Sequence, residues 1–265
     1  MTAPDEGEIT TEARGAVWLM GINRPHKLNG FTPAMFDQLA AAYERLESDP
    51  DLRVGVLFAH GPHFTAGLDL PMFAGRFADD SDFAGVTGDR VDTFGRRAPW
   101  RRKPLITAVK GITFTAGLEL ALASDIIIAA NDVRLAMMEP KRGLMACGGA
   151  TYRFVERGGW GNAMRWLLTG DEFGAEEGYR IGIIQEIVAP GFELNRAIAL
   201  AESIATRAPL AVQATRANAL TYALDGEAAC AAEFGDISNR LANSQDFQEG
   251  VASFREKRAA NFTGR

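Results

Sequence analysis

The pattern of apolar and polar residues divides the chain into a mixed part and a helical part. In the mixed part, residues 34–46 have apolar side chains at helical spacing, with the N-cap signal Thr32–Pro33 before them and Asp49–Pro50 after them. Short apolar runs predict strands at residues 16–22, Val54–Ala59, Leu105–Val109, Ile126–Ala130 and 185–188. Strands that alternate with helices predict an α/β fold.

From about residue 192 onward, the chain is almost continuously rich in helix-forming residues. We place a boundary near residues 207–209, between an α/β core at residues 1–207 and a helical region at residues 208–265. The stretch 209–258 is too helical and too rich in Ala and Leu to be a free tail. We therefore expect it to pack against other subunits.

A long loop, residues 73–100, separates two of the predicted strands. Loops of this length are typically functional lids or partly mobile segments. Its aromatic side chains either line a ligand pocket or belong to the core, and they are Phe73, Phe77, Phe83, Phe94 and Trp100.

Composition and charge narrow the class of protein. The 265 residues are 47% hydrophobic and 23% charged, as in ordinary globular proteins, and no apolar run approaches the length of a membrane helix. The net charge of −6 gives no electrostatic reason to bind nucleic acid or an anionic membrane. The nearest basic cluster, residues 96–97 with 101–103, is either a solvated loop or a surface facing a phosphorylated ligand. The first 15 residues do not resemble a targeting signal, so we expect a cytoplasmic protein.

Cysteine and histidine are too few and too scattered to predict a metal centre. The two cysteines, Cys147 and Cys230, lie far apart, and the histidines are His26, His60 and His63. Neither set matches the spacing of a zinc site, and the cysteines match no disulfide framework. We expect no metal.

Three segments indicate chemistry. Residues 63–70 form a turn of small residues after a predicted strand, where a ligand could approach the backbone. Residues 113–123 run from a similar turn into a helix whose first turn holds Glu119 among apolar residues. A buried carboxylate is costly unless it has partners or a function, and a helix start can stabilise an oxyanion. In the third segment Glu139 precedes a glycine-rich helix start, although it could instead pair with Lys141 or Arg142.

Taken together, the motifs resemble the crotonase (enoyl-CoA hydratase) superfamily. They include FTAGLDL, KPLITAVKG followed by TAGLELALASD, MEPKRGL, and the C-terminal EGVASFREKRAANF. The resemblance extends from about residue 17 to residue 262. It implies a spiral of ββα units with a C-terminal helical trimerisation region, and a homotrimer or homohexamer. The implied ligand is an acyl-CoA thioester, with coenzyme A as part of the substrate and no separate cofactor.

The resemblance also assigns roles to individual residues. The backbone amides of Leu68 and Ala116 would form the oxyanion hole, and Glu119 and Glu139 would jointly activate water and deliver a proton. In some members, C-terminal residues reach the coenzyme A of a neighbouring subunit. The residues implied to contact substrate or coenzyme A are Lys27, Leu28, Asn29, Ala66, Asp69, Leu70, Pro71, Gly143, Cys147, Phe254 and Lys257.

The two glutamates favour hydration of a 2-enoyl-CoA to a 3-hydroxyacyl-CoA. Isomerisation of a 3-enoyl-CoA, another acyl-CoA reaction such as hydrolysis or decarboxylation, and a weakly catalytic acyl-CoA-binding protein remain alternatives. Departures from the family pattern bear on this choice. Ala116 and Cys147 stand where glycine is usual, and Lys110 stands where asparagine is common.

Overall fold

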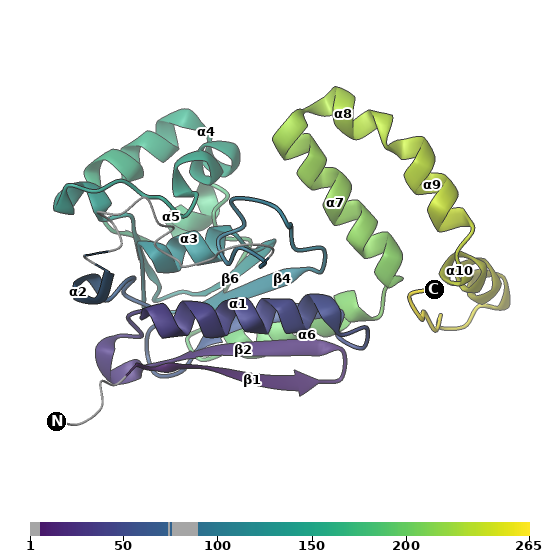
Figure 1. Cartoon of the computed structure of the whole chain (residues 1–265), viewed down its shortest axis with the longest axis horizontal. Coiled ribbons are helices and arrows are strands. Elements are labelled where there is room, and N and C mark those ends of the chain that lie inside the picture. The colour runs from purple at the N-terminus through teal and green to yellow at the C-terminus, as the bar shows by residue number, and fades with distance from the viewer. Residues whose placement is uncertain (1–5, 74, 76–89) are drawn as a thin grey trace.

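The computed structural model describes residues 6–73, 75 and 90–265. Within these ranges the main sheet has six strands in the order β1-β2-β3-β4-β6-β9. The strands β1 and β2 are antiparallel, and the later neighbours pair in parallel (Figure 1). The strand bounds are Glu8–Arg14, Val17–Asn23, Val54–Ala59, Leu105–Val109, Ile126–Ala130 and Glu186–Val188. The mixed α/β fold predicted from the sequence is confirmed.

Helices cover both faces of this sheet, which explains its apolar strands. Along β3, Val56 packs toward helix α6 (Glu193–Ala205), whereas Leu57 belongs to the larger core on the other face. That larger core also includes the apolar face of helix α1 (Pro33–Ser48). Helix α1 begins as predicted, because the Thr32 hydroxyl accepts a hydrogen bond from the Met35 amide at 3.2 Å.

A smaller sheet places the predicted carboxylates. It consists of β5 (Ile112–Phe114), β7 (Arg134–Ala136) and β8 (Phe173–Gly174), in that order. Strands β5 and β7 are parallel neighbours, so their carboxyl ends lie at the same edge. Helix α3 (Ala116–Leu122) follows β5, and the 3₁₀ helix η2 (Glu139–Arg142) follows β7. The first residues of α3 and η2 therefore lie close together at this edge of the small sheet.

The remaining core elements surround this edge and the sheet. They are the 3₁₀ helix η1 (Pro25–Lys27) and the helices α2 (Leu70–Phe73), α4 (Ala150–Thr169) and α5 (Ala175–Arg180). No helix in the described ranges is both long enough and apolar enough to cross a membrane.

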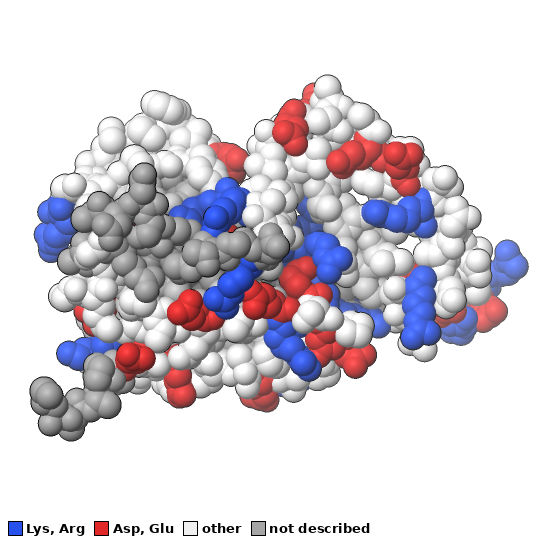
Figure 2. Space-filling view, in the orientation of Figure 1, with Lys and Arg blue, Asp and Glu red and all other residues white. Residues whose placement is uncertain are grey.

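The last four helices form an arm beside the core (Figure 1). They are α7 (Pro209–Asp225), α8 (Glu227–Ala232), α9 (Phe234–Ala242) and α10 (Gln245–Glu256). On α7, Arg216 forms an ion pair with Asp125 of the core at 2.9 Å. Charged side chains of both signs gather where the arm meets the core (Figure 2). That the arm forms an oligomerisation region stays a prediction.

Candidate active site

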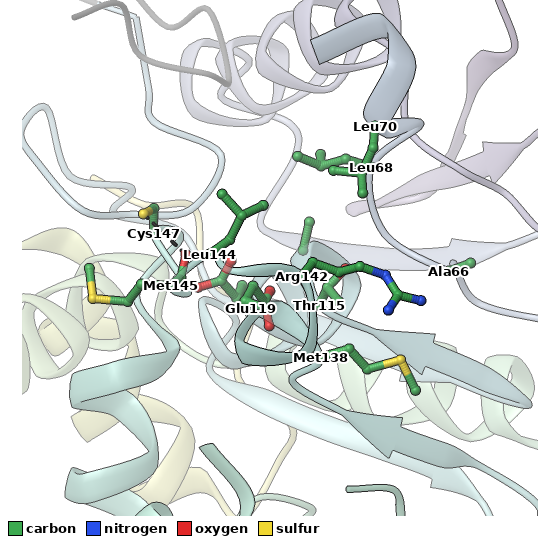
Figure 3. Close-up of a pocket in the computed structure, with 12 residues that line it drawn as sticks. Ala66, Leu68, Leu70, Thr115, Glu119, Met138, Arg142, Leu144, Met145 and Cys147 are labelled. Carbon is green, nitrogen blue, oxygen red and sulfur yellow. Dashed lines mark hydrogen bonds between the residues drawn. The ribbon is translucent and has the colours of Figure 1, made fainter. Parts of the chain in front are cut away.

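A cavity of about 210 Å³ opens at the edge where α3 and η2 begin. Side chains from three separate segments converge on it (Figure 3). Its lining is largely apolar apart from two carboxylates and one arginine. The lining residues are Ala66, Leu68, Leu70, Thr115, Ala116, Glu119, Met138, Glu139, Arg142, Leu144, Met145 and Cys147. Both predicted carboxylates and both predicted oxyanion-hole residues thus share one cavity.

Glu119 is fixed inside the protein. It lies in the first turn of α3 and is only 2% exposed. Its Oε1 accepts hydrogen bonds from the amides of Gly148 at 2.7 Å and Ala150 at 3.1 Å. Gly148 has to be glycine for this contact, since a Cβ there would lie 2.6 Å from Glu119 Oε2. Burial raises the pKa of Glu119, although the two amide bonds act against the rise.

Glu139 is less constrained than Glu119. It is the first residue of η2, and its buried Oε2 has no hydrogen-bond partner within the described part of the chain. Burial raises its pKa to about 7, and the charge of Glu119 adds to the rise. The alternative pairing with Lys141 or Arg142 is wrong. The Lys141 ammonium lies 3.5 Å from Asp171, and the Arg142 guanidinium donates to the Lys141 carbonyl.

Two backbone amides at the cavity donate no hydrogen bond to the described part of the chain. The Phe31 amide donates to the Gly67 carbonyl at 2.8 Å, and the Phe31 carbonyl accepts a hydrogen bond from the Asp69 amide at 2.9 Å. The intervening amide of Leu68 therefore points away from Phe31. Ala116 is the first residue of α3, where an N–H has no partner within the helix. In the described ranges, neither amide donates to another protein group.

Close backbone packing holds these amides in place. Gly67 has a φ of 102°, and a Cβ at this residue would overlap the Thr115 side chain. Thr115 itself has a φ of 50°, which is rare for a residue with a side chain. The Thr115 amide donates to the Ala136 carbonyl of β7 at 2.8 Å, which anchors this conformation to the small sheet.

The segment before this turn frames the cavity. The Asn29 side chain is buried, accepting from the Arg24 amide and donating to the carbonyls of His60 and His63. Asp69 pairs with Arg24 at 2.8 Å. The side chains of Asn29 and Asp69 are therefore held by protein partners, and contact between these two segments and coenzyme A stays a prediction. Their exposed neighbours, which remain available to a ligand, are Lys27, Leu28, Leu70 and Pro71.

Cys147 lies at the cavity with an exposed side chain whose thiol contacts the Met145 carbonyl at 3.3 Å. Partial loss of solvent around its sulfur and the charge of Glu119 raise the pKa of the Cys147 thiol, which disfavours the reactive thiolate. Its backbone amide makes no hydrogen bond to the described ranges. Gly143 ends η2 in a left-handed conformation with a φ of 72° and does not line the cavity.

Phe254 and Lys257 lie on or next to α10, away from this cavity in the same chain (Figure 1). Their contact with the coenzyme A of a neighbouring copy stays a prediction. Phe73 and Phe94 are fully buried against Phe36, with ring centroids 6.0 and 5.5 Å apart from it, so both belong to the core. Trp100 lines a different cavity. Phe77 and Phe83 lie outside the described residues.

Sequence reasoning missed several lining residues, namely Thr115, Met138, Arg142, Leu144 and Met145. For Arg142, Leu144 and Met145 the sequence carried no signal of this placement. The hydrogen bond from the Gly148 amide to Glu119, which brings the end of this segment to the cavity, is seen only in the structure. Among the described residues, no group of histidine, cysteine or carboxylate side chains could hold a metal ion.

Comparisons with known proteins identify the family of this chain. Residues 12–265 match the family described as enoyl-CoA hydratase/isomerase. Enoyl-CoA hydratase EchA19 of Mycobacterium tuberculosis is 34% identical over 262 residues, covering 97% of both chains. The 1,2-epoxyphenylacetyl-CoA isomerase of Escherichia coli is 32% identical, covering 97% of this chain and 98% of its own.

A solved structure extends the likeness to the fold. The crystal structure of a probable enoyl-CoA hydratase/isomerase from Mycobacterium abscessus superposes with a TM-score of 0.93 at 42% identity. The match covers 97% of this chain and 98% of the other. Fold, cavity and sequence matches over nearly the whole length thus agree, and the chain belongs to the enoyl-CoA hydratase/isomerase (crotonase) family.

Proposed function

We propose that this enzyme adds water across the 2,3 double bond of a 2-enoyl-CoA, giving the 3-hydroxyacyl-CoA. The thioester oxygen would accept hydrogen bonds from the free amides of Leu68 and Ala116. These donors would stabilise the negative charge that reaches this oxygen as water attacks Cβ. Coenzyme A would enter as part of the substrate.

The observation that carries this proposal is the unpartnered Oε2 of Glu139 beside Glu119. Hydration needs one carboxylate to take a proton from water and one carboxyl group to deliver a proton to Cα. Both glutamates have raised pKa values, and that of Glu139 is about 7, so a pair that holds one proton is accessible near neutral pH. The proton-transfer roles are assigned to Glu119 and Glu139 jointly.

The nearest alternative is movement of a double bond within an enoyl-CoA. One relative carries the name of an isomerase, and a single carboxylate can move a proton between two carbons. The number of required glutamates distinguishes the two reactions. Hydration needs Glu119 and Glu139, whereas isomerisation with only one of them would leave the other dispensable.

We expect Glu119→Gln and Glu139→Gln each to lower hydration of crotonyl-CoA by about 10²–10⁴-fold, because each substitution removes a group that transfers a proton. Loss of the conjugated enoyl absorbance and product mass would be followed together, with a 3-enoyl-CoA assayed in parallel. Binding of coenzyme A should be largely retained in both variants.

The exposed Glu202→Gln on α6 is the matched control and should match the parent rate. Hydration at the parent rate in either active-site variant would refute the two-carboxylate mechanism. Loss of 3-enoyl-CoA turnover in one variant only, without hydration by the parent, would identify an isomerase.

A further inference from the structure

A second cavity lies at the opposite end of α3 from the candidate active site. Its volume is about 150 Å³, and its lining is mostly polar. Leu122 and Ser124, at the end of α3, contribute to it, whereas Ala116 and Glu119 at the helix start face the first cavity. Arg216 and Leu220 of α7 line it from the arm, in the region where charged side chains gather in Figure 2.

Two of its arginines, one helical turn apart on α4, have no carboxylate partner in the described chain. Arg157 donates through Nη2 to the carbonyls of Leu122 and Ser124, each at 2.9 Å. Arg153 donates to three carbonyls, those of Gly148, Phe94 and Gly95. Burial, together with the nearby charge of Arg153, lowers the pKa of Arg157 to about 10. Among the described residues, these two partly buried cations form no ion pair, and they are stabilised by carbonyl groups, by the Tyr152 ring under Arg153 and by more distant carboxylates.

The other charges around the cavity are already paired. Arg101 and Arg216 both contact the carboxylate of Asp125 at 2.9 Å. Asp92 is occupied by Arg96 at 2.9 Å. The remaining lining carboxylate, Glu156, has an exposed side chain. Among the described residues, the lining of this cavity therefore has more positive than negative charge.

Three buried polar atoms of the lining lack a partner within the described ranges. They are Tyr43 Oη, Thr93 Oγ1 and Arg157 Nη1. Tyr43 and Thr93 are only 2% and 1% exposed. Burial raises the pKa of Tyr43, so its hydroxyl keeps the proton and can donate. Buried polar groups without partners are rare in folded proteins, which points to a missing acceptor.

We propose that this second cavity binds one small oxyanion of the phosphate or sulfate class. An oxyanion would accept hydrogen bonds from both hydroxyls and from Arg157, and would balance the two unpaired cations. At about 30 Å³ per water molecule, the space holds one such ion with a few waters. Water alone would satisfy the hydroxyls but leave the charge unbalanced.

The bound ion would connect the arm to the loop whose Gly148 amide holds Glu119. On one side the cavity is lined by Arg216 of α7. On the other, Arg153 donates to the Gly148 carbonyl at 3.0 Å, and the Gly148 amide holds Glu119 at 2.7 Å. A bound ion would therefore stabilise both the junction between arm and core and the loop that holds Glu119. This site does not depend on which reaction the first cavity catalyses.

The test is titration of the full chain with inorganic phosphate at constant ionic strength, by calorimetry and thermal unfolding. Saturating coenzyme A is present throughout to occupy any phosphate site in the first cavity. Acetate replaces phosphate in a second series. We expect saturable phosphate binding that raises the unfolding temperature, with sulfate behaving alike and acetate binding more weakly.

Tyr43→Phe and Thr93→Val remove only the unpartnered hydroxyls, so the fold should survive. Each should weaken phosphate binding about tenfold or more, the effect of losing one hydrogen bond to a charged group. The exposed Tyr179→Phe on α5 is the matched control and should bind like the parent. Absence of saturable binding in the parent would overturn the proposal, as would binding that both hydroxyl variants leave unchanged.

Discussion

The partly buried carboxylate of Glu139 is suited to proton transfer, and the same burial makes its charged form costly for the stability of the fold. It is partly buried, its Oε2 has no partner in the described chain, and its pKa is raised to about 7. An unfolded chain would return this pKa to near 4.5. Between these values the folded state binds more protons than the unfolded state, so this residue's contribution to stability falls as pH rises.

We therefore expect Glu139→Gln to stabilise the protein at pH 8, because glutamine removes the buried charge. The gain in unfolding temperature should be small at pH 5 and grow through pH 7. Thermal unfolding of the parent and the variant across this range measures it. Glu202→Gln, at an exposed position, should show no such growth. A gain that is equal at pH 5 and pH 8 would contradict the raised pKa.

The pKa of Glu139 also predicts the pH dependence of catalysis. If the pair with Glu119 works with one proton, kcat/KM should decline as pH rises above about 7 and the shared proton is lost. The decline should be measured with crotonyl-CoA between pH 6 and pH 9. A rate that stays flat or increases over this range would argue against the shared proton.

At this scale the sequence predicted that both glutamates share one cavity with Leu68 and Ala116, because all four belong to recognisable motifs. It could not predict which hydrogen bonds and ion pairs the polar side chains around the cavity make. The bonds from Asn29 to His60 and His63, and from Asp69 to Arg24, depend on contacts between loops distant in sequence. No local pattern distinguishes such a positioning side chain from a ligand contact.

At the scale of elements, the turn at Gly67 determines where the Leu68 amide points. We expect Gly67→Ala to reduce turnover by about 10²-fold or more, because its Cβ would displace Thr115 and misplace an oxyanion donor. Gly191→Ala is the matched control. Its φ of 86° is also left-handed, but no atom lies within 4 Å of the added Cβ. Steady-state kinetics on both variants separate the clash from backbone strain, and equal activity losses would contradict the positioning role.

The strands and helices that the sequence predicted differ in burial or in length from those that it missed. The core strands and α1 have apolar runs or helical spacing, and the structure places them within two residues of the predicted bounds. Strand β1 was missed because it lies at a sheet edge and only Ile9 of its side chains is buried. The strands of the small sheet have two or three residues each, too few to show a period.

At the scale of the whole molecule, the arm exposes several large apolar side chains. Phe254 is 88% exposed, and with Phe247 and Val251 it lines an apolar groove. Such patches are typical of protein–protein interfaces. We expect the protein to sediment as a trimer or hexamer, as the family resemblance implies.

Phe247→Asp should shift this assembly toward monomer by placing a charge in the groove. Gln248→Asp adds the same charge to an exposed position on α10 outside the groove, and should leave the assembly unchanged. Analytical ultracentrifugation at micromolar concentration measures both. A parent protein that is monomeric there would remove the case for Phe254 and Lys257 as ligand contacts from a neighbouring copy.

The backbone around the first cavity has one further consequence, for how tightly a ligand can bind. Three of the four non-glycine residues with positive φ in the described chain, Leu28, Asn29 and Thr115, belong to the segments that form or frame it. Each such residue costs roughly 1–3 kcal/mol, and the packing of the surrounding core offsets that cost during folding. A ligand therefore meets donors that are already oriented and loses little free energy in ordering them. Substitutions that relieve the positive φ of these residues would therefore raise thermal stability but lower catalysis.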